Sequence, residues 1–319
     1  MTGSWGLAAD WVTYEGKQGP GIGKHIVFVS GDEEYRSEEA LPMLARILAV
    51  RHGFKCTVLF AVNPADGTIT PTVVTNIPGI QALDSADLCF LFLRFRELPD
   101  EQMKHFVDFL QTGKPMIALR TSTHAFKYDQ NKQSPYAKFD WASKDWPGGF
   151  GQQVLGETWV NHWGNHGHES TRGIISETQK SNPILRGVSD IWGPTDVYEV
   201  AHLPTDATVL VYGEVLTGMK STDPAVEGKK NKPMMPLIWT RNYAAGKGNK
   251  VLTSTIGAAV DLESEDLRRL LVNASYWAVG LADKIPSRAD VAVVGEYKPL
   301  WFGFGKYKPG VKPGDLELK

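Results

Sequence analysis

Short apolar runs and longer periodic segments alternate along the first half of the chain. Four apolar, β-branched runs are typical of buried strands, at residues 24–30, 55–61, 87–95 and 115–119. Two segments with apolar residues at helical spacing lie between them. The first begins at Ser37 as its N-cap and ends at Gly53, and the second begins at Pro99 and ends at Gly113. This alternation predicts a doubly wound, mainly parallel sheet with helices on both faces.

The second half is less regular. Residues 127–149 are polar, aromatic and rich in Gly and Pro, which predicts a flap, and residues 151–159 favour a short helix. The segment 220–233 is a charged, exposed excursion. A last helix is predicted from Ser264 to Gly280. Further strands are predicted at residues 196–200, 207–212, 235–240 and 250–256.

These elements predict one α/β domain with an extension at each end. We expect an N-terminal extension at 1–23, the domain at 24–282, and an extended C-terminal tail at 283–319 that packs on the domain. Cys56 and Cys89 lie in the second and third predicted strands. A strand order of 2-1-3 places the first strand between them, so both thiols are predicted to be buried and reduced.

Composition narrows the class of partner. The net charge of -2 and the lack of a basic stripe argue against nucleic-acid binding. No run of about 18 apolar residues is present, so no membrane span is predicted. Ten Trp and ten Tyr favour ligands with apolar ring faces and hydroxyl groups, such as sugars. The sequence therefore points to a small-molecule carbohydrate, with homo-oligomer formation left open.

The N-terminus leaves the compartment open. Residues 1–24 lack the apolar core of a signal peptide, which predicts a cytoplasmic protein for the chain as written. However, residues 5–10 after the Met-Thr-Gly-Ser start resemble a mature N-terminus. A periplasmic or secreted protein whose signal peptide has been removed is the alternative.

Ligands of doubly wound sheets bind outside the carboxyl ends of the strands. Three loops follow predicted strands there, at residues 31–36, 94–97 and 121–124. His124 ends a central strand, and we predict that it is catalytic and faces the crevice. Arg96 has a plainer interpretation as a surface partner of Glu97. The predicted substrate-binding residues on or beside these loops are Asp32, Glu34, Tyr35, Arg36, Arg94, Thr123 and Phe126.

Residues 162–169 (HWGNHGHE) hold three of the eight histidines. Gly164 and Gly167 disfavour a regular helix, so we expect a loop that folds over the same rim. Such imidazoles bind a transition metal, transfer protons or hydrogen-bond a sugar, and an ordinary surface loop is the alternative. If a divalent metal such as zinc binds, the predicted ligands are His162, His166 and His168. The working hypothesis is metal-free proton transfer.

Several segments, taken in order, resemble one family. Over residues 24–280 the chain resembles the ThuA-like (trehalose-utilisation) family, which has a class I glutamine-amidotransferase-like, flavodoxin-type fold. The segments that carry this resemblance are Gly31-Asp32, Thr123-His124-Ala125-Phe126, residues 182–187 (NPILRG), Asp196-Val197-Tyr198-Glu199, residues 236–241 (PLIWTR) and residues 268–280.

The chain departs from that pattern at two places. The stretch that would carry the nucleophilic Cys of an amidotransferase reads Leu119-Arg120-Thr121-Ser122-Thr123, so glutaminase chemistry is not expected. Ser122 is a poor alternative nucleophile, because His124 is too close in sequence to activate it easily. Many relatives carry a Gly-His pair where this chain has Gly257-Ala258.

The resemblance implies a role in carbohydrate metabolism. We predict acid–base chemistry on a sugar or oxidised (keto) sugar, with His124 and one of His162, His166 or His168 as acid and base, and Glu199 and Asp32 orienting them. Proton abstraction beside a carbonyl suits this set better than direct glycosidase chemistry, which needs two flanking carboxyl groups. The alternatives are a non-catalytic sugar-binding or scaffold protein and a metal-dependent hydrolase. The remaining predicted substrate contacts are Trp163, Tyr198, Trp239 and Arg241.

Overall fold

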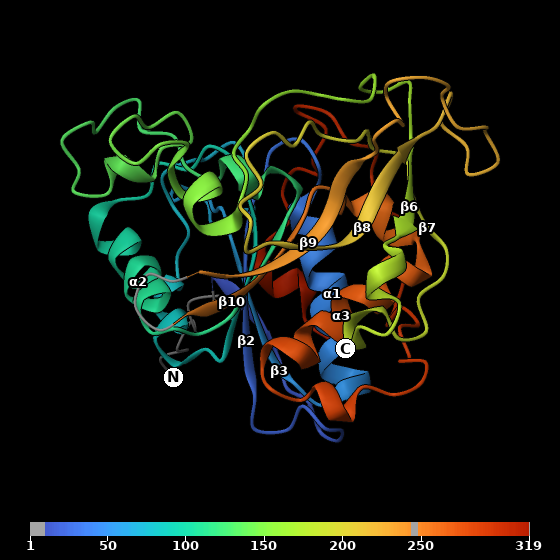
Figure 1. Ribbon diagram of the computed structural model, residues 1–319. Coiled ribbons are helices and arrows are strands. Elements are labelled where there is room, and N and C mark those ends of the chain that lie inside the picture. Colours follow the sequence, from blue (N-terminus) through green and yellow to red (C-terminus); the bar gives the residue numbers. More distant parts are fainter. Residues whose placement is uncertain (1–9, 244–247, 319) are drawn as a thin grey trace, which may run out of the picture.

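A ten-stranded sheet organises the computed structural model, which describes residues 10–243 and 248–318 (Figure 1). Its strand order is β1-β3-β2-β4-β5-β10-β9-β8-β6-β7. The strands are β1 (Trp11–Tyr14), β2 (His25–Gly31), β3 (Lys55–Phe60), β4 (Leu88–Leu93), β5 (Met116–Leu119), β6 (Thr171–Ile175), β7 (Ile191–Gly193), β8 (Thr208–Val215), β9 (Met235–Tyr243) and β10 (Asn249–Ser254).

The sheet has a parallel half and an antiparallel half. β3, β2, β4, β5 and β10 run parallel, and β3-β2-β4 confirms the 2-1-3 order. β9, β8, β6 and β7 pair antiparallel, as does β1 on β3. The sheet is therefore mixed, and the prediction of a mainly parallel sheet was wrong. Only residues 244–248 separate β9 from β10, which is too short for the crossover that parallel strands need.

Helices cover both faces of the sheet. α1 (Ser37–His52) and α3 (Glu265–Ala278) pack on one face, and α2 (Asp100–Gln111) packs on the other, each over its own apolar core (Figure 1). The predicted cap at Ser264 is confirmed, because its Oγ accepts the N–H of Leu267. The predicted Ser37 cap is wrong, because Ser37 lies inside α1 and its Oγ accepts the Asp32 N–H instead.

Short turns complete the chain. Residues Gly151–Leu155 form a single π-helical turn inside the predicted 151–159 helix.

Residues 196–200 do not form the predicted strand, and only an isolated bridge joins Tyr198 to His162. β1, β6 and β7 were not predicted. The 3-10 turns are Ile80–Ser85, Arg120–His124, Ala137–Phe139, Glu177–Gln179, Pro183–Leu185, Ala259–Glu263, Ala282–Lys284 and Pro313–Leu316.

The C-terminal segment lies against the body of the protein. Phe302 is buried, Tyr297 donates its hydroxyl hydrogen to the Ala259 carbonyl at 2.7 Å, and the Leu316 carbonyl accepts from Tyr14 in β1 at 2.7 Å. The first nine residues of the predicted N-terminal extension lie outside the described part. Cys56 and Cys89 are buried free thiols, as predicted, with β2 between their strands.

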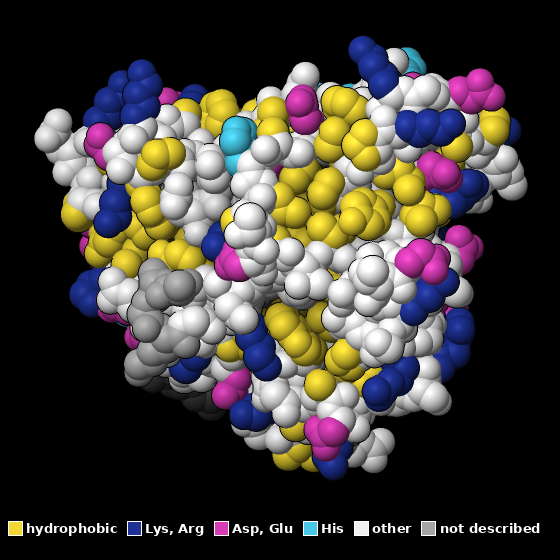
Figure 2. Space-filling view, viewed as in Figure 1, with side chains coloured by type: hydrophobic (Ala, Val, Ile, Leu, Met, Phe, Trp, Pro, Cys, Tyr) yellow, Lys and Arg dark blue, Asp and Glu magenta, His cyan; other side chains and the backbone are white. Residues whose placement is uncertain are grey.

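Charged and hydrophobic side chains share the face of the molecule that Figure 2 shows. Lys, Arg, Asp and Glu side chains are interspersed around its margin, with hydrophobic side chains between them (Figure 2). Among the described residues, no helix combines the length and apolarity that a membrane crossing requires.

Candidate functional site

The loop after β2 is held in place by Asp32. Its Oδ1 accepts the backbone N–H groups of Glu34 (2.8 Å) and Tyr35, and its Oδ2 accepts the Thr121 hydroxyl at 2.5 Å. These hydrogen bonds join the loops after β2 and β5, and Asp32 is fully buried between them. The rim predicted from the sequence is thus formed, but the contacts of Asp32 are structural ones.

Backbone strain concentrates at this rim. Among the described residues, Arg36 (φ 61°), Phe95 (φ 52°) and Arg120 (φ 40°) are the non-glycine residues with positive φ. They lie in the three loops that follow β2, β4 and β5. Left-handed backbone is costly for a residue with a Cβ and persists where surrounding contacts enforce it, which is common at functional sites.

Arg120 joins four segments at the floor of the rim. Its Nη1 donates to the carbonyls of Asp196 (3.0 Å) and Thr255 (2.7 Å), and its Nη2 donates to the Asp196 carboxylate (2.9 Å). The guanidinium carbon lies 4.2 Å from the ring centroids of both Tyr35 and Tyr198. Arg120 is fully buried, so this cation is fixed beside a carboxylate and between two aromatic rings.

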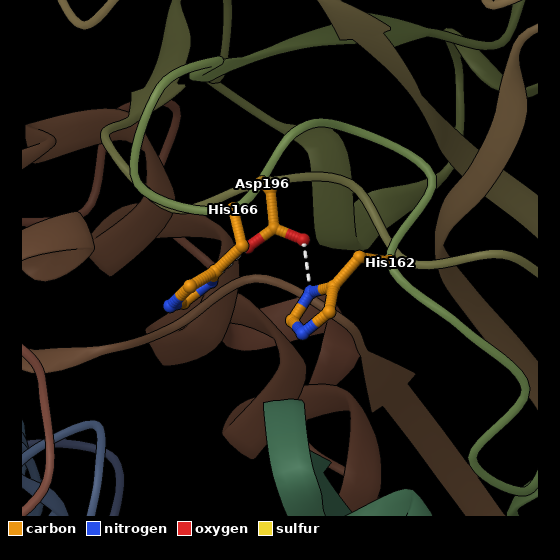
Figure 3. A group of neighbouring side chains, drawn as sticks. All are labelled: His162, His166 and Asp196. Atoms are coloured by element: carbon orange, nitrogen blue, oxygen red, sulfur yellow. Dashed lines mark hydrogen bonds and ion pairs between the residues drawn. The ribbon is translucent and has the colours of Figure 1, made fainter.

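Asp196 holds both imidazoles of the 162–168 loop. Its Oδ2 lies 2.6 Å from Nδ1 of His162, and its Oδ1 lies 2.9 Å from Nδ1 of His166 (Figure 3). Burial opposes ionisation of Asp196, but Arg120 and the two imidazoles outweigh it and hold the pKa of this carboxyl well below its usual range. An ionised carboxylate only accepts, so Nδ1 of each ring is the donor in these hydrogen bonds, and Nε2 of each ring is not bonded to Asp196.

A belt of charged residues surrounds the histidines. Glu34 Oε1 lies 3.6 Å from Nε2 of His166, and Glu34 Oε2 lies 3.6 Å from Nε of Arg94. Burial, reinforced by Asp32, raises the pKa of Glu34. Arg96 is fully buried and pairs with Glu33 at 2.7 Å, so its interpretation as a surface partner of Glu97 was wrong.

His124 lies behind an aromatic wall. Its ring contacts Phe95, Trp159 and Tyr198 at centroid distances of 5.0, 5.1 and 6.4 Å, and its Nδ1 lies 3.1 Å from the Thr123 hydroxyl. Burial, and then the nearby arginine charges, lower the pKa of His124 well below its ordinary value. This imidazole is therefore neutral at pH 7, and it connects to His162 through the ring of Trp159.

The C-terminal tail forms one wall of the site. The Phe302 ring lies 5.3 Å from His166 and 5.7 Å from Tyr35, and the Phe304 ring lies 4.9 Å from the Arg94 guanidinium. Arg36 fixes this segment by donating to the Gly303 carbonyl at 2.8 Å. The contacts of Arg36 thus belong to the packing of the tail.

In the part of the chain that the structure describes, six further predicted side chains make no hydrogen bond, ion pair or ring contact with His162, His166 or Asp196. His168 is exposed, and Glu199 makes no side-chain hydrogen bond or ion pair there. Phe126 and Trp239 are buried in the core, where the Trp239 indole donates to the Leu155 carbonyl. The Trp163 indole donates to the Lys230 carbonyl. Arg241 donates to the Gln153 carbonyl and to the Asp206 carboxylate.

The sequence reasoning missed the two residues that organise the site. Asp196 was assigned to a strand, and Glu199 was chosen in its place as the orienting carboxylate. Arg120 was noted only as part of a loop. A signal for Arg120 was present, because it directly follows the last residue of a buried central strand. Nothing in the pattern around Asp196 marks it as the partner of histidines 30 or more positions earlier.

The comparisons bear on the fold. No family model matches the chain, and no curated protein matches it in sequence. A protein described as ThuA-like from Parabacteroides merdae ATCC 43184 superposes with a TM-score of 0.50 at 13% identity, over 81% of this chain and 90% of that one.

Two further solved structures are similar at lower scores. A protein described as ThuA-like from Bacteroides uniformis ATCC 8492 has a TM-score of 0.49 at 12% identity, over 83% of this chain and 95% of that one. The glutaminase domain of CTPS from Trypanosoma brucei has a TM-score of 0.38 at 12% identity, over 84% and 98%. Identities this low show the fold alone, and the TM-score of 0.50 with the Parabacteroides merdae protein supports that fold. The chain therefore has the fold of a ThuA-like protein, in agreement with the resemblance of its sequence.

Proposed function

We propose that the rim binds a sugar or keto sugar and transfers a proton beside its carbonyl group, without glutaminase activity. The single observation that carries this is the pairing of two imidazoles with one buried carboxylate, since Asp196 bonds Nδ1 of both His162 and His166. Carboxylate-held imidazoles with a free Nε2 are effective proton carriers near neutral pH. In this proposal the fold is a doubly wound, flavodoxin-like domain at 24–282, flanked by extensions at 1–23 and 283–319.

The step balances with groups present at the rim. One imidazole takes the proton from the carbon next to the carbonyl, so the C–H bond breaks, an N–H bond forms at Nε2, and the electron pair moves to the carbonyl oxygen. The other imidazole, once protonated, donates to that oxygen or returns a proton to carbon. Glu34, at 3.6 Å from Nε2 of His166, can relay the proton.

The walls of the site support a ligand with apolar ring faces. Half-exposed Phe95 and Trp159 pack on His124, and Trp141 packs on Phe95. Phe302 closes the other side against His166. Aromatic rings pack on the apolar faces of sugars, while Arg94 offers donors to hydroxyl or carbonyl oxygens. Neutral His124 adds a hydrogen-bonding group behind this wall.

Deuterium exchange tests the proposal directly. A panel of sugars and 3-keto sugars is incubated with the protein in D2O, and exchange at the carbon beside the carbonyl is followed by NMR. We expect exchange with the parent protein and a loss of roughly 100-fold or more in H166A and H162A. H168A is the matched control, because this exposed imidazole of the same loop is outside the cluster. Binding without exchange would favour the non-catalytic sugar-binding alternative. Exchange that survives in both site variants would contradict the proposal.

A further inference from the structure

We propose that His162, His166 and Asp196 bind one divalent transition-metal ion, which takes the place of the two protons that the carboxylate shares with the imidazoles. The ion would lie in the site of the proposed function, but the assignment rests on geometry and not on that function. It replaces the ligand set predicted from the sequence, since Asp196 takes the position that was given to His168.

The distances favour this set. The candidate ligand atoms of the three residues lie within 4.8 Å of one another. The separations between Asp196 and the two Nδ1 atoms, 2.6 and 2.9 Å, are near the roughly 3 Å between adjacent ligands whose bonds to a metal are about 2.0–2.2 Å. Figure 3 shows both rings on the same side of the carboxylate. Small shifts would therefore admit the ion.

The residues around the three ligands are placed to orient them, as the neighbours of metal ligands commonly are. Imidazole ligands commonly present their other nitrogen to a carboxylate, and Nε2 of His166 lies 3.6 Å from Glu34. Arg120 fixes the Asp196 carboxylate at 2.9 Å, which orients it. Arg120 balances the charge of Asp196, and the Glu34 carboxyl group lies beside the site.

Accessibility favours a catalytic ion over a structural one. The His162 and His166 side chains are 35% and 34% exposed, whereas Asp196 is fully buried. An ion held by three ligands and reached from the imidazole side keeps positions for a substrate oxygen, as catalytic sites do. Two imidazoles and one carboxylate suit zinc, iron, manganese or nickel better than magnesium or calcium. The ion would polarise a carbonyl oxygen of the ligand.

Metal titration of the full chain tests the assignment. Protein freed of metal with a chelator is titrated with Zn2+ by calorimetry and with Co2+ by visible absorption. We expect one ion per chain, and H162A, H166A and D196N should each weaken binding by at least about 100-fold. H168A should bind as the parent does. The surface pair of His105 and Asp84, at 2.8 Å, gives a second control in H105A.

The outcomes separate this assignment from the proposed function. Equal weakening in H168A, or unchanged binding in H162A and H166A, would show binding by loop histidines in general and overturn the assignment. Thermal unfolding checks that each variant is folded, and E34Q, which leaves the three ligands intact, should weaken binding only about 10-fold. Deuterium exchange that persists in chelator-treated protein, together with no binding of Zn2+ or Co2+ in the titrations, overturns the metal assignment and leaves the proposed function standing. Tight metal binding without deuterium exchange would support the metal assignment and contradict the proposed function.

Discussion

The cavity beside the C-terminal tail and the rim around Asp196 differ in chemistry. The cavity, of about 930 Å³, lies between α1 and the tail, and apolar side chains such as Met43, Tyr297 and Val311 line much of it. The rim holds the strained residues, the paired imidazoles and the buried arginine. The candidate site is therefore marked by polar groups with fixed partners, which the apolar walls of the cavity do not supply.

The difference has a physical cause. The cavity is bounded on one side by the C-terminal tail, which along this wall forms no helix or strand beyond the 3-10 turn Pro313–Leu316. The rim is built where parallel strands end, and each of its loops is tied to the next through Asp32, Arg120 and Asp196. A site that must place proton-carrying groups needs the second kind of support.

The largest expected effect is at Asp196. Asp196→Ala removes the partner of a fully buried arginine and of two imidazoles, and we expect the free energy of unfolding to fall by about 3–5 kcal/mol. Urea denaturation followed by circular dichroism measures it. A loss below about 1 kcal/mol would mean that Arg120 finds water or another partner, and the rim would then be less rigid than its contacts indicate.

Phe302→Ala should have the next largest effect. This buried ring of the tail packs on Tyr35 and His166, and its loss should cost about 2–3 kcal/mol in the free energy of unfolding, less than in a rigid core because the tail can relax. Uncovering His166 should also speed its carbethoxylation, which mass spectrometry measures. An unchanged rate of modification would show that the tail does not shield the site.

Glu38→Gln tests how a buried carboxyl group at the cavity makes stability depend on pH. Burial raises the pKa of Glu38 from 4.5 to about 8, and neither carboxyl oxygen has a hydrogen-bond partner among the described residues. The folded protein thus binds more protons than the unfolded chain between these values, so this group makes stability fall as pH rises from about 4.5 to 8. The variant should be about 1–2 kcal/mol more stable than the parent at pH 8.5 and little changed at pH 5, as thermal unfolding at both values would show. Equal effects at both pH values would contradict the shift.

Tyr307→Ala should have the smallest effect. Tyr307 is an aromatic residue of the same tail as Phe302, but it lines the cavity and is only half-buried. We expect a change within about 0.5–1 kcal/mol and unaltered metal affinity. If Tyr307→Ala destabilises as much as Phe302→Ala, or weakens Zn2+ binding, the cavity and the rim around Asp196 are more closely coupled than we infer.

The sequence alone determined the parallel half of the fold. The apolar runs of β2, β3, β4 and β5 are continuous because both faces of these strands are buried, and the order β3-β2-β4 agrees with the predicted 2-1-3 order. The antiparallel half was less predictable. β6 and β7 are short and half-exposed, so their residues carry little apolar pattern, and β1 pairs at an edge with a strand more than 40 residues away.

The candidate site divides in the same way. Local pattern placed the His162–His168 segment in a loop and His124 at the end of a strand, whereas the strand ends at Leu119 and His124 closes the 3-10 turn that follows it. Which imidazoles turn inward, and which carboxylate receives them, depended on contacts across 30 to 34 positions of sequence. Asp196 and Arg120 form their pair across 76 positions, so only the folded sheet, by bringing the end of β5 to residue 196, could decide it.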